Sequence, residues 1–200
     1  MIVSLKIIII IMTILLLYLL YYYINNQDMI YVKSNIDNQY YLVRNYNDKQ
    51  ISSDTLAKLK QNIFIIVNHV KNMDTTKNAK SQTMIPHIKQ LCDRIQNVII
   101  RESSMKSKFT SYCVNKGEEL VFCIRIQKEG GEIHNINLLM YIVIHEISHI
   151  ACPEEGHTAL FNNIFNFLCG ISIELGLYNK IPFKTNPENY CGMLINDSII

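Results

Sequence analysis

Two histidines and a glutamate have a spacing that suits metal chemistry, in the segment His145-Glu146-Ile147-Ser148-His149. On an α-helix, residues four apart lie one turn apart on the same face, so both imidazoles are expected to reach one ion. Glu146 would project beside them, where its carboxylate can accept a proton from metal-bound water without being a ligand. The motif therefore predicts a zinc ion (Zn2+) bound by His145 and His149, with Glu146 as the catalytic base and acid.

The surrounding residues predict that this motif lies on a buried helix. Residues 136–151 are apolar on nearly every side of such a helix, and Asn135 offers an N-cap side chain at its start. The two histidines and the glutamate need partners there, because burying unpaired polar or charged groups costs roughly several kcal/mol. Zinc would satisfy all three side chains, whereas a hydrogen-bonded pair in the core is the alternative.

The third zinc ligand is expected to be His157. A catalytic zinc usually takes three protein ligands and leaves the fourth position for water. Pro153 and Gly156 break the helix after the motif, so the chain can double back between His149 and His157 and return an imidazole to the metal. The alternative is that His157 only begins the next helix.

Other acidic and histidine side chains are weaker candidates for the metal. Glu174 is the second contender, because some zincins take a glutamate from a downstream helix. The remaining candidates are expected to be solvated, or to be ordinary surface or core residues: Glu154, Glu155, His69, His87 and His134. Of these, His134 is also considered for a role behind the metal ligands.

Hydrophobic periodicity predicts both helices and strands, so the expected fold class is α+β. The expected strands cover residues 30–33, 39–44 and 120–126. The expected helices cover residues 52–72, capped by Ser52, Ser53 or Asp54, then 85–101 with Pro86 in the first turn, 136–151 and 158–175. Residues 74–83 are expected to form a loop, and the chain beyond Leu177 is expected to be irregular.

The N-terminal segment is long and apolar enough to cross a membrane. Residues 2–24 contain Lys6 as their only charged side chain, and about 20 helical residues span a hydrocarbon core of about 30 Å. A cleaved signal peptide is the rival interpretation, but the apolar run is longer than usual and no small-x-small cleavage site precedes Ile24. We therefore expect a single-pass transmembrane anchor at 2–24, with a slight bias toward a cytoplasmic N-terminus, and one globular domain at 28–200.

The charge and the cysteine pattern exclude some classes of protein. The formal net charge is +2 and no long run of Lys or Arg occurs, so direct nucleic-acid binding is not expected. The six cysteines form no CxxC pair and are too sparse for a disulfide-stapled mini-domain. They are expected to be reduced, buried thiols.

The sequence resembles the WLM and SprT-like zinc metallopeptidases, and in particular small membrane-anchored WLM-like proteins of large DNA viruses. The resemblance lies in the histidine motif followed by His157 and Phe161, in Thr110-Ser111-Tyr112, in Asn115-Lys116-Gly117 before residues 120–126, and in Tyr190-Cys191-Gly192. It implies a zincin-like minimal metallopeptidase domain with three histidines on one zinc ion, in a viral or host-cell membrane. The longer metzincin pattern does not fit, because His157 comes two residues too late and Cys152 stands where that pattern has glycine. Many cellular members cleave proteins crosslinked to DNA through additional segments, which this sequence does not show.

The expected reaction is hydrolysis of peptide bonds in a protein or peptide substrate. Zinc would polarise the carbonyl and lower the pKa of bound water, while Glu146 moves the proton from water to the leaving amine. Candidates for a donor to the oxyanion are Tyr178, Tyr190 and His134. If residues 120–126 form an edge strand, it could take an extended peptide by strand addition, although an ordinary core strand is as compatible with the pattern.

Two rival interpretations belong to other classes. One is an inactive zincin-like fold that serves as a membrane-tethered interaction module or a structural virion protein. The other is a purely structural zinc, which would need a fourth protein ligand; Cys152 is the only thiol close to the motif in sequence.

Overall fold

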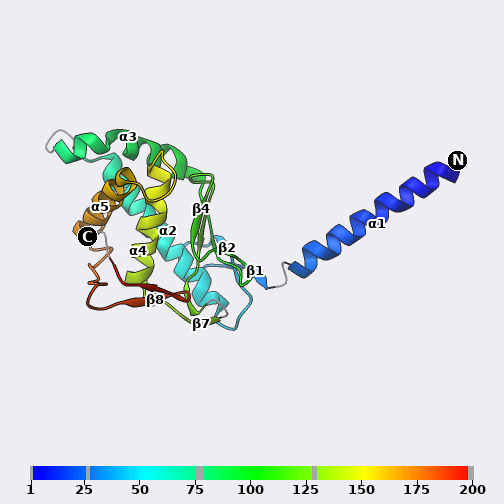
Figure 1. Cartoon of the computed structure of the whole chain (residues 1–200). Coiled ribbons are helices and arrows are strands. Elements are labelled where there is room, and N and C mark those ends of the chain that lie inside the picture. Colours follow the sequence, from blue (N-terminus) through cyan, green and yellow to red (C-terminus); the bar gives the residue numbers. More distant parts are fainter. Residues whose placement is uncertain (1, 26–27, 75–78, 128–129, 198–200) are drawn as a thin grey trace.

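The helix that carries the histidine motif runs through the middle of the folded domain (Figure 1). The computed structural model describes residues 2–25, 28–74, 79–127 and 130–197. Helix α4 (Ile136–Ala151) packs against α2 (Lys49–Lys71), α3 (Ala79–Arg94) and α5 (Ala159–Glu174). Its aliphatic side chains form the centre of the core, and the Asn135 side chain caps it by accepting a hydrogen bond from the Leu138 N–H at 2.9 Å.

A small sheet lies beside this helix. Strand β5 (Glu119–Phe122) is its middle strand, with β3 (Ile99–Glu102) parallel on one side and β4 (Tyr112–Val114) antiparallel on the other. Strand β4 also packs on α4, which brings an edge of the sheet next to the histidine motif. Among the described residues, three two-stranded antiparallel sheets accompany it: β1 (Met29–Lys33) with β2 (Tyr40–Arg44), β6 (Arg125–Gln127) with β7 (Gly130–Ile133), and β8 (Glu188–Tyr190) with β9 (Met193–Ile195).

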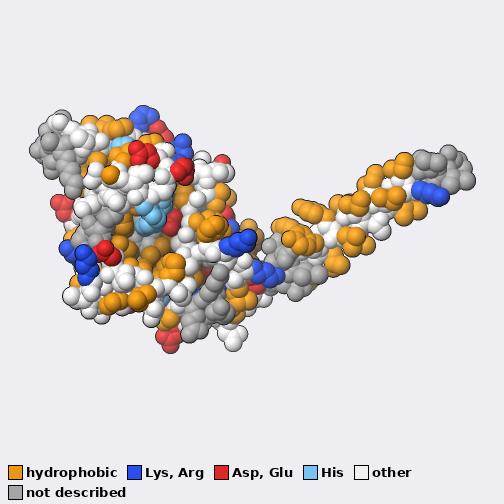
Figure 2. Space-filling view, in the orientation of Figure 1, with side chains coloured by type: hydrophobic (Ala, Val, Ile, Leu, Met, Phe, Trp, Pro, Cys, Tyr) orange, Lys and Arg blue, Asp and Glu red, His pale blue; other side chains and the backbone are white. Residues whose placement is uncertain are grey.

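The N-terminal helix α1 (Ile2–Asn25) extends away from the rest of the chain (Figure 1). Its window from Lys6 to Tyr23 has a mean hydropathy of 2.1, and none of that window is buried against the domain. Figure 2 shows hydrophobic side chains along its length. One N-terminal helix is therefore long and apolar enough to span a membrane or to act as a signal sequence.

The α+β class and several predicted elements are confirmed. The first hairpin, α4 and α5 lie where the periodicity placed them, and the Thr158 side chain caps α5 by accepting from the Phe161 N–H. These elements were predictable because each has a clear apolar period and a polar residue at its boundary.

The predicted start of α2 is wrong, because the helix begins at Lys49 rather than at the three expected capping residues. Those side chains bind other elements instead. Ser53 donates to the Val32 carbonyl at 2.9 Å, and the Asp54 carboxylate accepts from the Ser34 hydroxyl at 2.8 Å. Ser52 accepts a hydrogen bond from Arg125 at 2.8 Å. Local capping preference gave way to tertiary hydrogen bonds.

The predicted boundaries of α3 are also wrong. The helix already includes Ala79, so part of the expected 74–83 loop is helical, while residues 75–78 lie outside the described residues. Pro86 is inside the helix rather than in its first turn. The helix ends at Arg94, and the β-branched residues after it pair with β5 as strand β3 instead of continuing to 101.

Residues 120–126 do not form one strand. The chain pairs within the three-stranded sheet up to Phe122 and then changes partner, so that Arg125 begins β6. Because β5 has neighbours on both sides, it is the core strand of the two alternatives and not the edge strand that could take a peptide. The region beyond Leu177 is also more regular than predicted, since it contains the β8–β9 hairpin.

The expectation of six reduced thiols is wrong as well. Cys123 and Cys191 form a disulfide that joins positions 68 residues apart, with the two Cα atoms 6.4 Å apart. Four cysteines are free, and three of these, Cys92, Cys152 and Cys169, are buried. Sequence spacing could not reveal the pair, because the fold alone brings the C-terminal segment beside the β5–β6 junction.

Candidate metal centre

Three histidine side chains converge on one point at the surface of α4. The Nε2 atoms of His145 and His149 are 3.3 Å apart, and those of His145 and His157 are 3.0 Å apart. One ligand atom from each residue lies within 4.8 Å of the others. Tetrahedral zinc with Zn–N bonds of about 2.0–2.1 Å separates its nitrogen ligands by roughly 3.3 Å, so this donor set fits the ion.

An aromatic residue of α5 supports all three imidazoles. The Phe161 ring stacks on His149 with the centroids 4.3 Å apart, and it contacts His145 and His157 at 5.0 and 4.9 Å. Phe165 also contacts His145 edge to face, with the ring centroids 5.3 Å apart. These contacts hold the rings in fixed orientations, as a site that binds a metal without rearrangement requires.

Lys116 holds the loop that carries His157. Its Nζ atom donates to the backbone carbonyls of Cys152, Pro153 and Glu154 at 2.8, 3.0 and 2.8 Å, and it pairs with the Glu155 carboxylate at 3.2 Å. A cation at this place also suits the negative end of the α4 dipole. We did not predict this role, and the only signal in the sequence was the turn motif that contains the lysine.

The turn that presents Lys116 needs a glycine next to it. Gly117 has a φ of 119°, and a Cβ atom there would lie 3.2 Å from both the Cβ and the carbonyl oxygen of Arg94. Asn115 and Lys116 are also in the left-handed region, with φ of 45° and 51°. The backbone is thus turned sharply to direct the lysine at the end of α4.

Burial keeps the two motif histidines neutral. It lowers the pKa of His145 to about 3 and that of His149 to about 4, with a further contribution from the neighbouring histidines. Neutral imidazole is the form that binds metals, so both side chains are ready to act as ligands at neutral pH.

Glu146 lies in the same pocket as the histidines and is 5% exposed. Burial raises the pKa of its carboxyl to about 8, and a cation nearby would lower it again. Among the described residues it has no hydrogen-bond partner, so its oxygens remain available to water or substrate. A carboxylate in this position can exchange protons with a molecule bound beside the three imidazoles.

The pocket in front of the histidines has a volume of about 300 Å³. One wall is the histidine motif, a second is the loop that carries His157, and the third is the start of β4 with Ser111, Tyr112 and Cys113. Figure 2 shows histidine side chains reaching the surface within a hollow on this face of the domain. The imidazoles are therefore accessible from solvent.

Among the described residues, the other predicted ligands do not belong to the histidine cluster, although Glu155 lines the pocket in front of it. The side chains of Glu154, Glu155 and Glu174 are exposed. Within the described part of the chain, Cys152 is not a member of the cluster that the three histidines form. Tyr178 is buried next to Tyr141, where its hydroxyl accepts from the Ile181 N–H. Tyr178 was one of three candidate donors to the oxyanion. The other two are Tyr190 and His134, whose ring centroids lie 5.3 Å apart beneath the pocket wall.

The fold and the site define an α+β domain with a three-histidine centre, preceded by an apolar helix. The chain belongs to the same family as the protein named "Uncharacterized protein R325" of Acanthamoeba polyphaga mimivirus, with 39% identity over 171 residues that cover 85% of this chain and 84% of the relative. It is also 26% identical over 160 residues to "Uncharacterized protein 136R" of Invertebrate iridescent virus 6, covering 80% of this chain and 85% of that one. The relatives are viral. No family model matches the chain, and no solved structure does.

Proposed function

We propose that this protein is a zinc-dependent peptidase that is anchored to a membrane by residues 2–24. The observation that carries the proposal is the convergence of three imidazole nitrogens within 4.8 Å, with the Glu146 carboxylate in the same open pocket. If the three histidines only formed hydrogen bonds with one another, they would not need a carboxylate beside them. Glu146 nevertheless lies there and has no hydrogen-bond partner among the described residues. His145, His149 and His157 would hold the zinc, which supplies Lewis acidity and activates a water molecule.

Glu146 is the proton carrier in this mechanism. Its carboxylate accepts a proton from the attacking water and later returns it to the nitrogen of the leaving amine. The pocket wall keeps the carboxylate largely away from bulk solvent, which strengthens its interaction with a bound substrate. The same side chain therefore serves as base and then as acid.

The free side of β4 supports a peptide as the substrate. Tyr112 and Cys113 of this strand line the pocket, and β4 pairs with β5 on one side only within the described sheet. An extended peptide could add to that edge through main-chain hydrogen bonds and place its scissile carbonyl in front of the histidines. This edge takes the role that was one of two alternatives for residues 120–126.

The test uses the full chain in detergent micelles, with zinc content and cleavage of casein and a peptide library as the readouts. Wild type should contain one zinc per chain and cleave, while Glu146→Gln should keep the zinc and lose about 10²–10⁴-fold in rate. Glu174→Gln, on an exposed helix end, is the matched control and should behave as wild type. Zinc without cleavage would favour the alternative of an inactive, zincin-like interaction or structural virion protein, and a folded sample without zinc would refute the metal centre.

Membrane anchoring is tested separately in cells that express the chain. An anchored protein should stay in the membrane pellet after alkaline carbonate extraction and keep residues 2–24 at its mature N-terminus. Release of a shortened domain would instead identify the segment as a signal sequence.

A further inference from the structure

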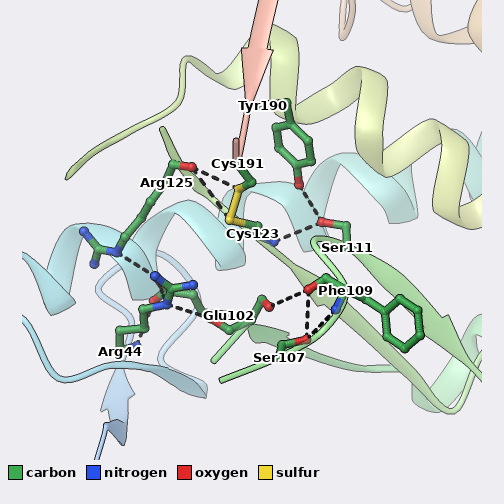
Figure 3. Close-up of a disulfide and its surroundings, with 10 residues drawn as sticks. Arg44, Glu102, Ser107, Phe109, Ser111, Cys123, Arg125, Tyr190 and Cys191 are labelled. Atoms are coloured by element: carbon green, nitrogen blue, oxygen red, sulfur yellow. Dashed lines mark hydrogen bonds and ion pairs between the residues drawn. A yellow bond between two sulfur atoms is a disulfide. The ribbon is translucent and has the colours of Figure 1, made fainter. Parts of the chain in front are cut away.

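The wall of the pocket opposite the histidines contains a serine whose hydroxyl is held by two other groups. Ser111 lines the same pocket as His145 and Glu146 and is partly exposed to it. Its Oγ accepts a hydrogen bond from the Cys123 N–H at 3.0 Å and lies 2.5 Å from the Tyr190 hydroxyl (Figure 3). Three segments thus meet at one oxygen atom, and one of them, at Tyr190, lies 79 positions from Ser111 in the sequence.

The direction of the short hydrogen bond follows from the burial of Tyr190, which is 1% exposed. A buried phenol has one proton, and leaving that proton without an acceptor costs about 1–3 kcal/mol. Among the described residues, Ser111 Oγ is the acceptor within reach of this hydroxyl. Tyr190 therefore donates to Ser111.

This direction decides where the serine proton goes. A hydroxyl oxygen has two lone pairs, and those of Ser111 accept from the Cys123 N–H and from the Tyr190 hydroxyl. Both acceptor positions are then occupied by groups in the protein wall. The remaining hydrogen of Ser111 is therefore free to bind a group in the pocket that Ser111 lines.

We propose that Ser111 donates a hydrogen bond to the substrate carbonyl oxygen and stabilises the oxyanion that forms there. This inference rests on the proposed peptidase function. When water attacks the carbonyl carbon, the C=O π pair moves onto the oxygen, and Ser111 stabilises that charge without giving up its proton. The oxygen then re-forms the double bond, the C–N bond breaks, and the amine leaves with the proton held by Glu146. Tyr190 is the positioning residue that orients the serine.

A disulfide holds both groups that orient the serine. Cys123 supplies the N–H that binds Ser111, and its bonded partner Cys191 directly follows Tyr190. The two sulfur atoms lie 3.7 and 3.0 Å from the Arg125 carbonyl oxygen, and the Arg125 guanidinium is in turn held by buried Glu102 at 2.8 Å. The disulfide therefore ties this wall to the C-terminal segment (Figure 3).

The experiment compares full-length Ser111→Ala, Ser111→Thr, Tyr190→Phe and wild type, each loaded with zinc. Turnover of the best peptide and the dissociation constant of a phosphinic peptide, which mimics the tetrahedral oxyanion, are both measured. Ser111→Ala should keep its zinc and lose about 10²-fold in kcat and in phosphinic peptide affinity. Ser111→Thr keeps a hydroxyl and should have a kcat and a phosphinic peptide affinity close to those of wild type. Tyr190→Phe should lower both quantities, but by less than Ser111→Ala does.

A matched control separates this role from a structural one. Ser107→Ala removes a hydroxyl from the same loop, where it donates to the Phe109 carbonyl at 2.8 Å, and it should leave turnover and affinity unchanged. Unchanged phosphinic peptide affinity in Ser111→Ala would overturn the proposal. If wild type binds the phosphinic peptide but cleaves nothing, the peptidase function fails, and the affinity of Ser111→Ala still decides the role of the serine. If zinc-loaded wild type does not bind the phosphinic peptide, both proposals fail.

Discussion

The two walls of the pocket are built in different ways. The histidine wall comes from one short stretch of chain, since His145 and His157 are only 12 positions apart. The opposite wall joins Ser111 to Tyr190 across 79 positions and is closed by a disulfide. Helical periodicity is enough to align the first wall, whereas the second exists only in the folded state. We therefore expect that a substitution in one wall leaves the structure of the other wall intact.

The largest effect should follow from removing a histidine of the first wall. His149→Ala deletes one of three predicted ligands and the ring that stacks on Phe161, so it should lose zinc and all detectable cleavage. His69→Ala, at an exposed position of α2, is the control and should keep both. Metal content after dialysis against buffered zinc is the measurement, and retention of one zinc per chain by His149→Ala would contradict the assignment.

Breaking the second wall should lower stability while sparing the metal. The Cys123→Ser/Cys191→Ser variant removes a cross-link over 68 positions, which chain-entropy arguments value at about 4 kcal/mol of unfolding free energy. Its zinc content should match wild type, because all three histidines lie outside the disulfide region, but its turnover should fall as Ser111 loses its fixed partners. Urea unfolding, zinc content and cleavage test this, and a parallel loss of zinc would show that the walls are not independent.

The metal-free protein should reveal the buried charges of the first wall through the pH dependence of its stability. Glu146 has a folded pKa raised to about 8, so its contribution is fully present below about pH 4.5 and is lost as the pH rises to about 8. His145 and His149 have lowered pKa values, so the unfolded chain takes up their protons first and stability falls as the pH drops below about 6.5.

The Glu146→Gln variant separates the contribution of Glu146 to the pH dependence of stability from that of the two histidines. In chelator-treated protein, the variant should gain stability relative to wild type between pH 5 and pH 8, on the order of a few kcal/mol. Urea unfolding at the two pH values measures this difference. A difference that does not change with pH would mean that Glu146 titrates normally.

The smallest effect should come from loosening the loop that joins the first wall to its third histidine. Lys116→Met removes the cation that binds three carbonyls before His157, so zinc should bind about 10-fold more weakly while the fold is kept. Lys89→Met, which breaks only an exposed ion pair with Asp93, is the matched control. Competition with a zinc-binding dye measures the affinity, and equal values for the two variants would exclude a positioning role for Lys116.

The sequence predicted the regular helices well but misplaced elements whose ends depend on distant partners. Asn135 caps α4 as expected because a cap acts within one turn. Ser52, Ser53 and Asp54 did not cap α2 as expected, because each found a partner outside its own helix. In the same way, Ile99 and Ile100 were assigned to a helix by their spacing, although pairing with β5 places them in a strand.

The sequence by itself determined the histidine wall, because ligand spacing on a helix and a break at Pro153 and Gly156 are local properties of the chain. The juxtaposition of His157 with the motif follows from that local geometry. Only the tertiary structure decided the opposite wall, where Ser111, Cys123 and Tyr190 meet. Its contacts depend on how strands and the C-terminal hairpin pack, and no spacing rule connects residues that are brought together by a common core rather than by one element.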